Sequence, residues 1–89
     1  MARVYFTPNL RRHIGEQNGG APGGTVAEVL DAHFSGKPFV RSYVLDDQGA
    51  LRRHMNIMVC GKPLKDRVRL SDPVPEDGEI YVIQALSGG

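Results

Sequence analysis

The chain has 89 residues, with 11 lysines and arginines against 10 aspartates and glutamates, for a formal net charge of +1. This length accommodates one domain with a small core, and the near-neutral charge argues against nucleic acid as the default partner. A single cysteine, Cys60, excludes an intramolecular disulfide and favours a reducing cytoplasm, while the absence of any apolar run near the roughly 18 residues of a membrane span argues against membrane insertion and secretion.

The first quarter of the sequence contains one clear strand pattern. Side chains alternate between apolar and polar over residues 3–7, which predicts a strand that ends at Pro8. Residues 10–17 place two apolar residues among basic ones, and we expect a weak second strand that returns antiparallel as a sheet edge. Residues 18–24 contain four glycines and a proline, a composition typical of a turn.

The clearest helix signal in the sequence begins at Thr25. Glu28 follows three positions later, which is the capping-box pattern that satisfies free backbone donors at a helix start. Apolar residues then recur at helical spacing through residues 26–34, so one stripe of the helix is expected to face the core. We expect Gly36 and Pro38 to end the helix.

The second half of the sequence contains two further strand patterns. Residues 39–45 are mixed, with a short helical turn expected to run into extended chain, and residues 46–49 have the composition of a turn. Residues 55–60 alternate and predict a strand in the middle of the chain. Residues 79–86, rich in isoleucine, tyrosine and valine, predict the last strand.

This order of elements predicts an α+β fold, with one mixed sheet packed on one main helix. The first and last strands are expected to lie side by side and parallel at the centre of the sheet. We expect a single domain over residues 1–86 and a flexible tail over residues 87–89. An extended tail of that length reaches about 10 Å from a well-anchored strand.

Two glycines, Gly88 and Gly89, close the sequence. Glycine has no Cβ, so a pair of glycines can lie extended in a channel too narrow for other residues. This end therefore suits the delivery of a carboxylate into the active site of another enzyme. A frayed terminus without a function is the alternative.

One face of the predicted sheet has apolar side chains on the side away from the helix. We expect four residues from three strands to collect there: Tyr5, Met58, Tyr81 and Ile83. An exposed apolar patch of this kind marks a protein contact, and a covering loop is the alternative interpretation.

Two short basic clusters occupy residues 11–13 and 52–54, and they would meet if the second strand lay near the middle strand. We interpret them as a solvated face or as a docking patch for an acidic partner rather than as an RNA site. The three histidines are scattered, so their spacing predicts no metal site. Cys60 stands in no catalytic motif, and we assign it to packing.

These features together resemble the small ubiquitin-like sulfur-carrier proteins, the family of the molybdopterin-synthase small subunit and the thiamine-pathway carrier. The resemblance rests on the strand at 3–7, the helix start at 25–30, the strand at 55–59, the turn at 76–79, and Gly88 with Gly89. Within that family, the chain looks most like the mycobacterial-type carrier of cysteine biosynthesis, on the evidence of residues 10–13, Gly15, Gln17, Asn56 and Ile57.

The resemblance implies a β-grasp fold and a carrier rather than an enzyme. An E1-like adenylating enzyme would use ATP to activate the Gly89 carboxylate, with Gly88 and Ser87 entering its channel. The resulting thiocarboxylate would donate sulfur to a biosynthetic acceptor enzyme, and the chain itself would bind no cofactor. Many relatives carry Ala-Val-Ala where this sequence has residues 85–87, Ala-Leu-Ser, so the adenylating partner and the pathway stay open.

Two other functions are compatible with these patterns. The chain could act as a protein modifier, attached through Gly89 to lysines of target proteins. Alternatively, it could be a non-catalytic interaction module that binds a partner through the sheet face, with no use for the tail.

Overall fold

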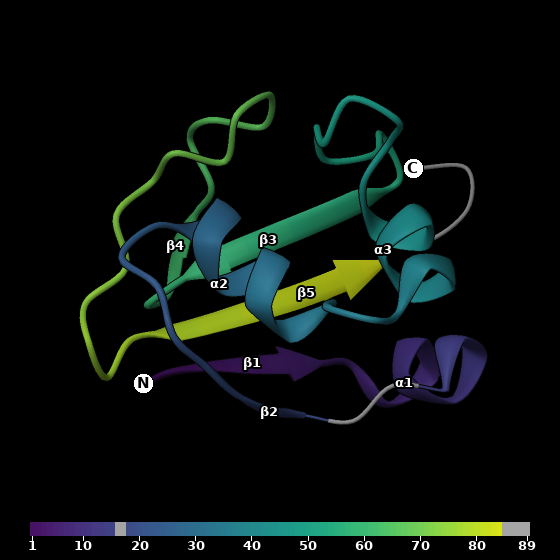
Figure 1. Cartoon of the computed structure of the whole chain (residues 1–89), viewed down its shortest axis with the longest axis horizontal. Helices are drawn as coiled ribbons and strands as arrows, with labels where there is room; N and C mark the ends of the chain where they lie inside the picture. Colours follow the sequence, from purple (N-terminus) through teal and green to yellow (C-terminus); the bar gives the residue numbers. More distant parts are fainter. Residues whose placement is uncertain (16–17, 85–89) are drawn as a thin grey trace.

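The computed structural model describes residues 1–15 and 18–84. Figure 1 shows that these residues form one sheet with helices beside it and at one of its ends. The strands are β1 (Ala2–Phe6), β2 (Gly19–Ala21), β3 (Met55–Val59), β4 (Lys62–Pro63) and β5 (Glu79–Gln84). The helices are α1 (Pro8–Ile14), α2 (Val26–His33) and α3 (Pro38–Val44).

The sheet is mixed, and its strand order is β2-β1-β5-β3-β4. Strand β5 lies at the centre, parallel to β1 with Val4 opposite Ile80, and antiparallel to β3 with Ile57 opposite Val82. The parallel central pair predicted from the sequence is therefore confirmed. The predicted boundary between a domain at residues 1–86 and a tail lies outside the described residues.

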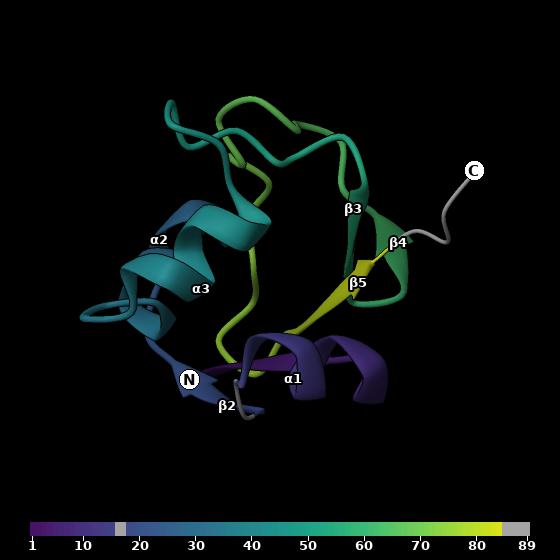
Figure 2. The same ribbon diagram turned by 90° about the vertical axis from the view of Figure 1, so that its right-hand side faces the viewer.

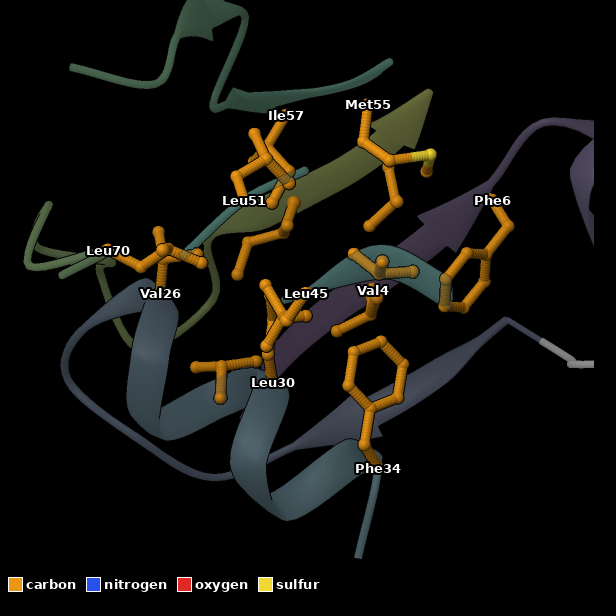
Figure 3. Close-up of a cluster of buried hydrophobic side chains, with 14 of the residues drawn as sticks. Val4, Phe6, Val26, Leu30, Phe34, Leu45, Leu51, Met55, Ile57 and Leu70 are labelled. Carbon is orange, nitrogen blue, oxygen red and sulfur yellow. The ribbon is translucent and has the colours of Figure 1, made fainter. Parts of the chain in front are cut away.

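Helix α2 packs on one face of this sheet. Its residues Val26, Val29 and Leu30 are fully buried, and Figure 3 shows Leu30 in the same cluster of side chains as Val4 and Ile57. A helix of eight residues is marginal alone in water. Burial of each large aliphatic side chain contributes about 1.5–3 kcal/mol, so contact with the sheet is what keeps α2 folded.

The start of α2 is fixed by the predicted cap. Thr25 Oγ1 accepts a hydrogen bond from the Glu28 amide at 3.2 Å, and Glu28 Oε1 accepts one from the Gly24 amide at 2.8 Å. The reciprocal bond thus falls on Gly24, one residue before the cap. Gly23 has a φ of +145°, and a Cβ there would lie 2.7 Å from the Val29 amide nitrogen, so only glycine fits this approach to the helix.

The expected strand at residues 10–17 is wrong, because residues 10–14 lie in helix α1. A proline stands in the first turn of α1, where its missing N–H costs nothing. Leu10 and Ile14 are both buried, and their spacing of four puts them on one helical face. Gly15 then ends the helix with a φ of +69°, a left-handed conformation that favours glycine.

The expected turn at residues 18–24 is also wrong in part, because it contains strand β2. This strand pairs antiparallel with β1, with Ala21 opposite Ala2. Asn18 extends the ladder, since its side-chain oxygen accepts a hydrogen bond from the Phe6 amide at 2.8 Å. The sheet edge expected from residues 10–17 is thus supplied by β2.

Residues 39–45 are more helical than expected. Helix α3 begins at Pro38 and buries Val40 and Val44, and Leu45 then adopts extended backbone and bridges to Leu51. In Figure 1, α1 and α3 both lie at the end of the sheet toward which β1 and β5 point. No helix within residues 1–15 and 18–84 is long and apolar enough to cross a membrane.

Candidate functional site

The central strand β5 leads directly to the predicted reactive end of the chain. Gln84, its last residue, lies opposite Met55 of β3. Because β5 is hydrogen-bonded to strands on both sides, the sheet fixes the point from which the chain continues. Ser87, Gly88 and Gly89 lie outside the described residues, so their roles stay predictions.

The open face of the sheet, on the side away from α2, contains all four residues expected there: Tyr5, Met58, Tyr81 and Ile83. Tyr81 lies opposite Tyr5 on one side and Met58 on the other. The rings of Tyr5 and Tyr81 are stacked, with centroids 4.8 Å apart and planes 17° from parallel. Tyr81 is 40% exposed, whereas the other three are half-buried, so the described loops leave this aromatic pair accessible.

Polar residues border this apolar centre. At one end of the open face, Arg3 lies opposite Glu79. At the other end, the Asn56 side-chain oxygen accepts a hydrogen bond from Arg67 Nη1 at 3.2 Å. An apolar centre with a polar border is the usual composition of a protein interface, although docking on this face stays a prediction.

The two basic clusters lie at the same end of the molecule, brought there by helices rather than by an edge strand. Tyr43 of α3 contacts the rings of both His13 and His54. No sequence pattern indicated that Tyr43 would contact these histidines, because residues 39–45 show no clear period. His33 lies elsewhere, with its ring 5.5 Å from that of Phe6. The described part of the chain contains no group of three or more His, Cys, Asp or Glu residues placed to hold a metal ion.

Cys60 is exposed in the turn between β3 and β4, so its predicted packing role is wrong. Its φ of +50° is the left-handed conformation that turns the chain back. A cavity of about 520 Å³ opens beside it. The lining includes Cys60, Lys62, Lys65, Asp66, Ser71 and Asp72.

Two carboxylates organise the loop beside this cavity. Asp66 accepts hydrogen bonds from the amides of Val68 and Arg69 and, at 2.5 Å, from the Ser71 hydroxyl. These bonds, with that from the Arg69 amide the strongest, lower the pKa of Asp66 from its usual 3.8 to about 2. The Asp72 carboxylate accepts hydrogen bonds from the backbone amides of Lys65 and Asp66. Both carboxylates therefore have structural roles.

No protein-family model and no curated protein sequence matches this chain. Solved structures do. A chain of the BexX/CysO complex from Amycolatopsis orientalis is 24% identical, with 100% of both chains covered and a TM-score of 0.81. CysO from Mycobacterium tuberculosis is 20% identical, with 97% of this chain and 100% of CysO covered and a TM-score of 0.78. Small archaeal modifier protein 1 (SAMP1) from Haloferax volcanii is 24% identical, with 99% and 98% covered and a TM-score of 0.74.

The chain has the ubiquitin-like β-grasp fold. At these identities the likeness establishes the fold, and the fold implied by the sequence resemblance is confirmed. The α+β class and the mixed sheet on one main helix are confirmed as well, with α1 and α3 as additions at one end. In this β-grasp fold, β5 is the central strand and carries two of the four open-face residues.

Proposed function

We propose that this chain is a sulfur carrier, a protein co-substrate whose Gly89 carboxylate is adenylated and converted to a thiocarboxylate by a partner enzyme. The observation that carries the proposal is the continuity between the central strand β5 and the sequence that ends in Gly88 and Gly89. Five residues follow Gln84, and an extended segment of that length reaches about 17 Å. Such a reach lets the sheet dock outside an enzyme while the last glycine enters it.

The proposed chemistry asks little of the chain itself. A carboxylate is a poor acyl donor, because oxide is a poor leaving group. Attack of the carboxylate on ATP gives an acyl adenylate and releases pyrophosphate. Sulfide then attacks the acyl carbon, AMP leaves, and the thiocarboxylate remains. In this proposal the partner binds ATP and supplies the catalytic groups, and the chain binds no cofactor of its own.

The partners we propose are an E1-like adenylating enzyme and a biosynthetic enzyme that accepts the sulfur, in the reducing cytoplasm that a single cysteine favours. A structural neighbour, CysO, was crystallised in a complex with BexX, which supports a partner enzyme for a β-grasp protein of this size. The sequence resemblance to the carrier of cysteine biosynthesis, and the presence of a CysO among the neighbours, favour cysteine or another sulfur-containing metabolite as the destination.

A second candidate function is a protein modifier joined through Gly89 to lysines of other proteins. The observation that favours it is the likeness to small archaeal modifier protein 1, whose name describes a modifier. Both functions begin with adenylation of the same carboxylate. They differ in the nucleophile that takes the acyl group, sulfur in one case and an amine in the other.

The test is the intact mass of the purified chain after incubation with ATP, sulfide and the adenylating enzyme encoded nearest to it. A carrier gains the mass difference between sulfur and oxygen at its end, and a chain that stops at Gly88 gains nothing. Conjugates of higher mass that disappear in the same truncation would assign the modifier function instead. Both tail-dependent functions are wrong if neither product forms with the full chain and if cells that carry the truncated chain show the same phenotype as cells that carry the full chain.

A further inference from the structure

Basic residues gather at the end of the sheet where β5 finishes. The clusters at residues 11–13 and 52–54 are far apart in the sequence, but Tyr43 lies between them. Its ring centroid is 5.0 Å from that of His13 in α1 and 5.9 Å from that of His54 before β3. Figures 1 and 2 show α1 and α3 together at this end. Three separate elements therefore contribute to one surface, which we call the basic patch.

Hydrogen bonds hold the 52–54 segment of the basic patch against α3. The Arg52 amide donates to the Val44 carbonyl at 3.1 Å, and Arg52 Nε donates to the Ser42 carbonyl at 2.6 Å. Arg67 braces the segment from the other side, since its Nη2 donates to the Arg52 carbonyl at 2.9 Å. The patch is thus ordered before any partner arrives, which lowers the entropic cost of binding to it.

Two arginines of the basic patch donate to uncharged groups in the contacts that the structure describes. Arg52 donates to a backbone carbonyl, and Arg12 donates to the side-chain amide of Asn9, so both acceptors are neutral. Arg41, just outside the patch, differs because it forms an ion pair with Asp31 at 2.5 Å. Neutral acceptors orient an arginine without cancelling its field, so the patch stays available to an anionic partner.

A concave region within the patch has the same character. A cavity of about 540 Å³ opens beside the 52–54 segment. It is lined by Asp46, Leu51, Arg52, Arg53, His54 and Arg67. Its one carboxylate is already engaged, since Asp46 Oδ1 accepts hydrogen bonds from the amides of Gln48 and Ala50. Three arginines thus line the cavity beside one carboxylate that is hydrogen-bonded within its own loop.

The position of the patch connects it with the end of the chain. Gln84 lies opposite Met55, and Met55 directly follows His54 of the patch. A protein that binds the chain beyond Gln84 would therefore lie next to the basic patch. At the other end of β5, the turn at residues 76–79 carries three carboxylates. One of these carboxylates, Glu79, lies opposite Arg3.

We propose that the basic patch docks an acidic surface of the adenylating enzyme and orients the chain with its end toward that enzyme's active site. This inference rests on the proposed carrier function. A protein fits the patch better than RNA does, because RNA recognition relies on exposed aromatic faces. Tyr43, the aromatic ring at its centre, is half-buried between two imidazoles.

The test is the rate of pyrophosphate release by the adenylating enzyme with charge-reversal variants of two exposed patch arginines, Arg12→Glu and Arg53→Glu. Each should lower kcat/KM about tenfold at low salt and leave kcat within about twofold, because steering acts on encounter and not on chemistry. Rising salt should lower kcat/KM steeply for the native chain and weakly for the variants. The matched control is Lys65→Glu, which makes the same charge change at an exposed residue beside the Cys60 cavity.

The outcomes separate this inference from the proposed function. Native chain that is adenylated with the same kinetics as both patch variants overturns the docking role and keeps the carrier function. An equal loss of kcat/KM in Lys65→Glu would mean that the effect depends only on net charge, and this result also overturns the docking role. Native chain that is never adenylated removes the carrier function and this inference together. Binding of a labelled single-stranded RNA that Arg53→Glu abolishes, with adenylation unchanged, assigns the patch to nucleic acid and overturns the proposal. Unfolding midpoints equal to that of the native chain exclude misfolding as the cause.

Discussion

The two faces of the central sheet use neighbouring residues of the same strands for different purposes. On the face toward α2, Ile80 and Val82 of β5 are fully buried. On the open face, Tyr81 between them is 40% exposed and stacks on Tyr5. Because side chains alternate along a strand, each step of one residue crosses from core to surface.

This difference shows how a very small domain meets two demands at once. The buried face supplies the apolar contacts that an 89-residue chain needs to fold. The open face combines the exposed Tyr81 with three half-buried apolar residues, and we expect it to contribute less to folding than the buried face. Substitutions on the two faces are therefore expected to separate stability from recognition.

The largest expected effect is that of Ile80→Ala on the buried face. Ile80 is completely buried at the centre of the sheet, so the change removes apolar contacts and leaves a cavity. We expect the free energy of unfolding to fall by about 2–5 kcal/mol, measured by urea denaturation. A loss below about 1 kcal/mol would contradict the assignment of this face to the core.

The next effect is that of Thr25→Ala, at the start of the helix that covers the buried face. The Thr25 hydroxyl accepts the Glu28 amide, and this bond has no replacement in alanine. We expect a loss of about 0.5–2 kcal/mol in the free energy of unfolding, because an amide of the first helical turn loses its acceptor. Thr25→Ser keeps the oxygen and serves as the control, so equal losses in both variants would argue against the cap.

A smaller change in stability is expected for Tyr81→Ala on the open face, the neighbour of Ile80. Loss of the stacked ring should cost about 0.5–1.5 kcal/mol in the free energy of unfolding, less than Ile80→Ala costs. If the open face contacts the adenylating enzyme, KM for the chain should rise at least about tenfold, since aromatic anchors dominate interfaces. An unchanged KM would remove the open face from the contact, and Arg3→Ala on the polar border is the control for a change in surface alone.

The central sheet could be predicted because its strands separate a buried face from an exposed one. Residues 3–7 and 55–60 alternate for that reason, while residues 79–86 are predicted as a strand by their isoleucine, tyrosine and valine content. The capping box at Thr25 marks the main helix equally well. In these segments the local pattern and the tertiary environment agree.

The elements at the edge of the sheet could not be predicted from the same signals. Helix α1 has only two buried residues, too few for a clear period, although its proline at the start and Gly15 at the end are ordinary helix boundaries. Strand β2 consists of two glycines and an alanine, whose backbone pairs while their side chains show no alternation. The two basic clusters were visible in the sequence, but their contact through Tyr43 depends on α1 being a helix packed on α3, which no local pattern indicated.

The smallest expected effect concerns the loop that closes the buried face beside α2, and it depends on pH. Asp66 has its pKa lowered to about 2, because amides and the Ser71 hydroxyl stabilise its carboxylate. The same loop places the fully buried Leu70 in the core, and its carbonyl accepts the Ala27 amide of α2 at 2.9 Å. A carboxyl whose pKa is lower in the folded state stabilises that state above its ordinary pKa and stops doing so as pH falls through the folded value.

We therefore expect the loop at residues 66–72 to open between pH 3.8 and about 2, while β5 stays closed. The measurement is amide hydrogen exchange, corrected for the intrinsic rate at each pH, at Arg69, Leu70 and Ala27, with Val82 as the internal reference. Protection from exchange at Arg69, Leu70 and Ala27 should fall as pH decreases through this window, whereas protection at Val82 should not change. Asp66→Asn should show the reduced protection at every pH and no change across the window. Loss of protection at Val82 in parallel with Leu70 would mean that acid unfolds the sheet and the loop together. Ionisation of Asp66 would then not control the opening of the loop by itself.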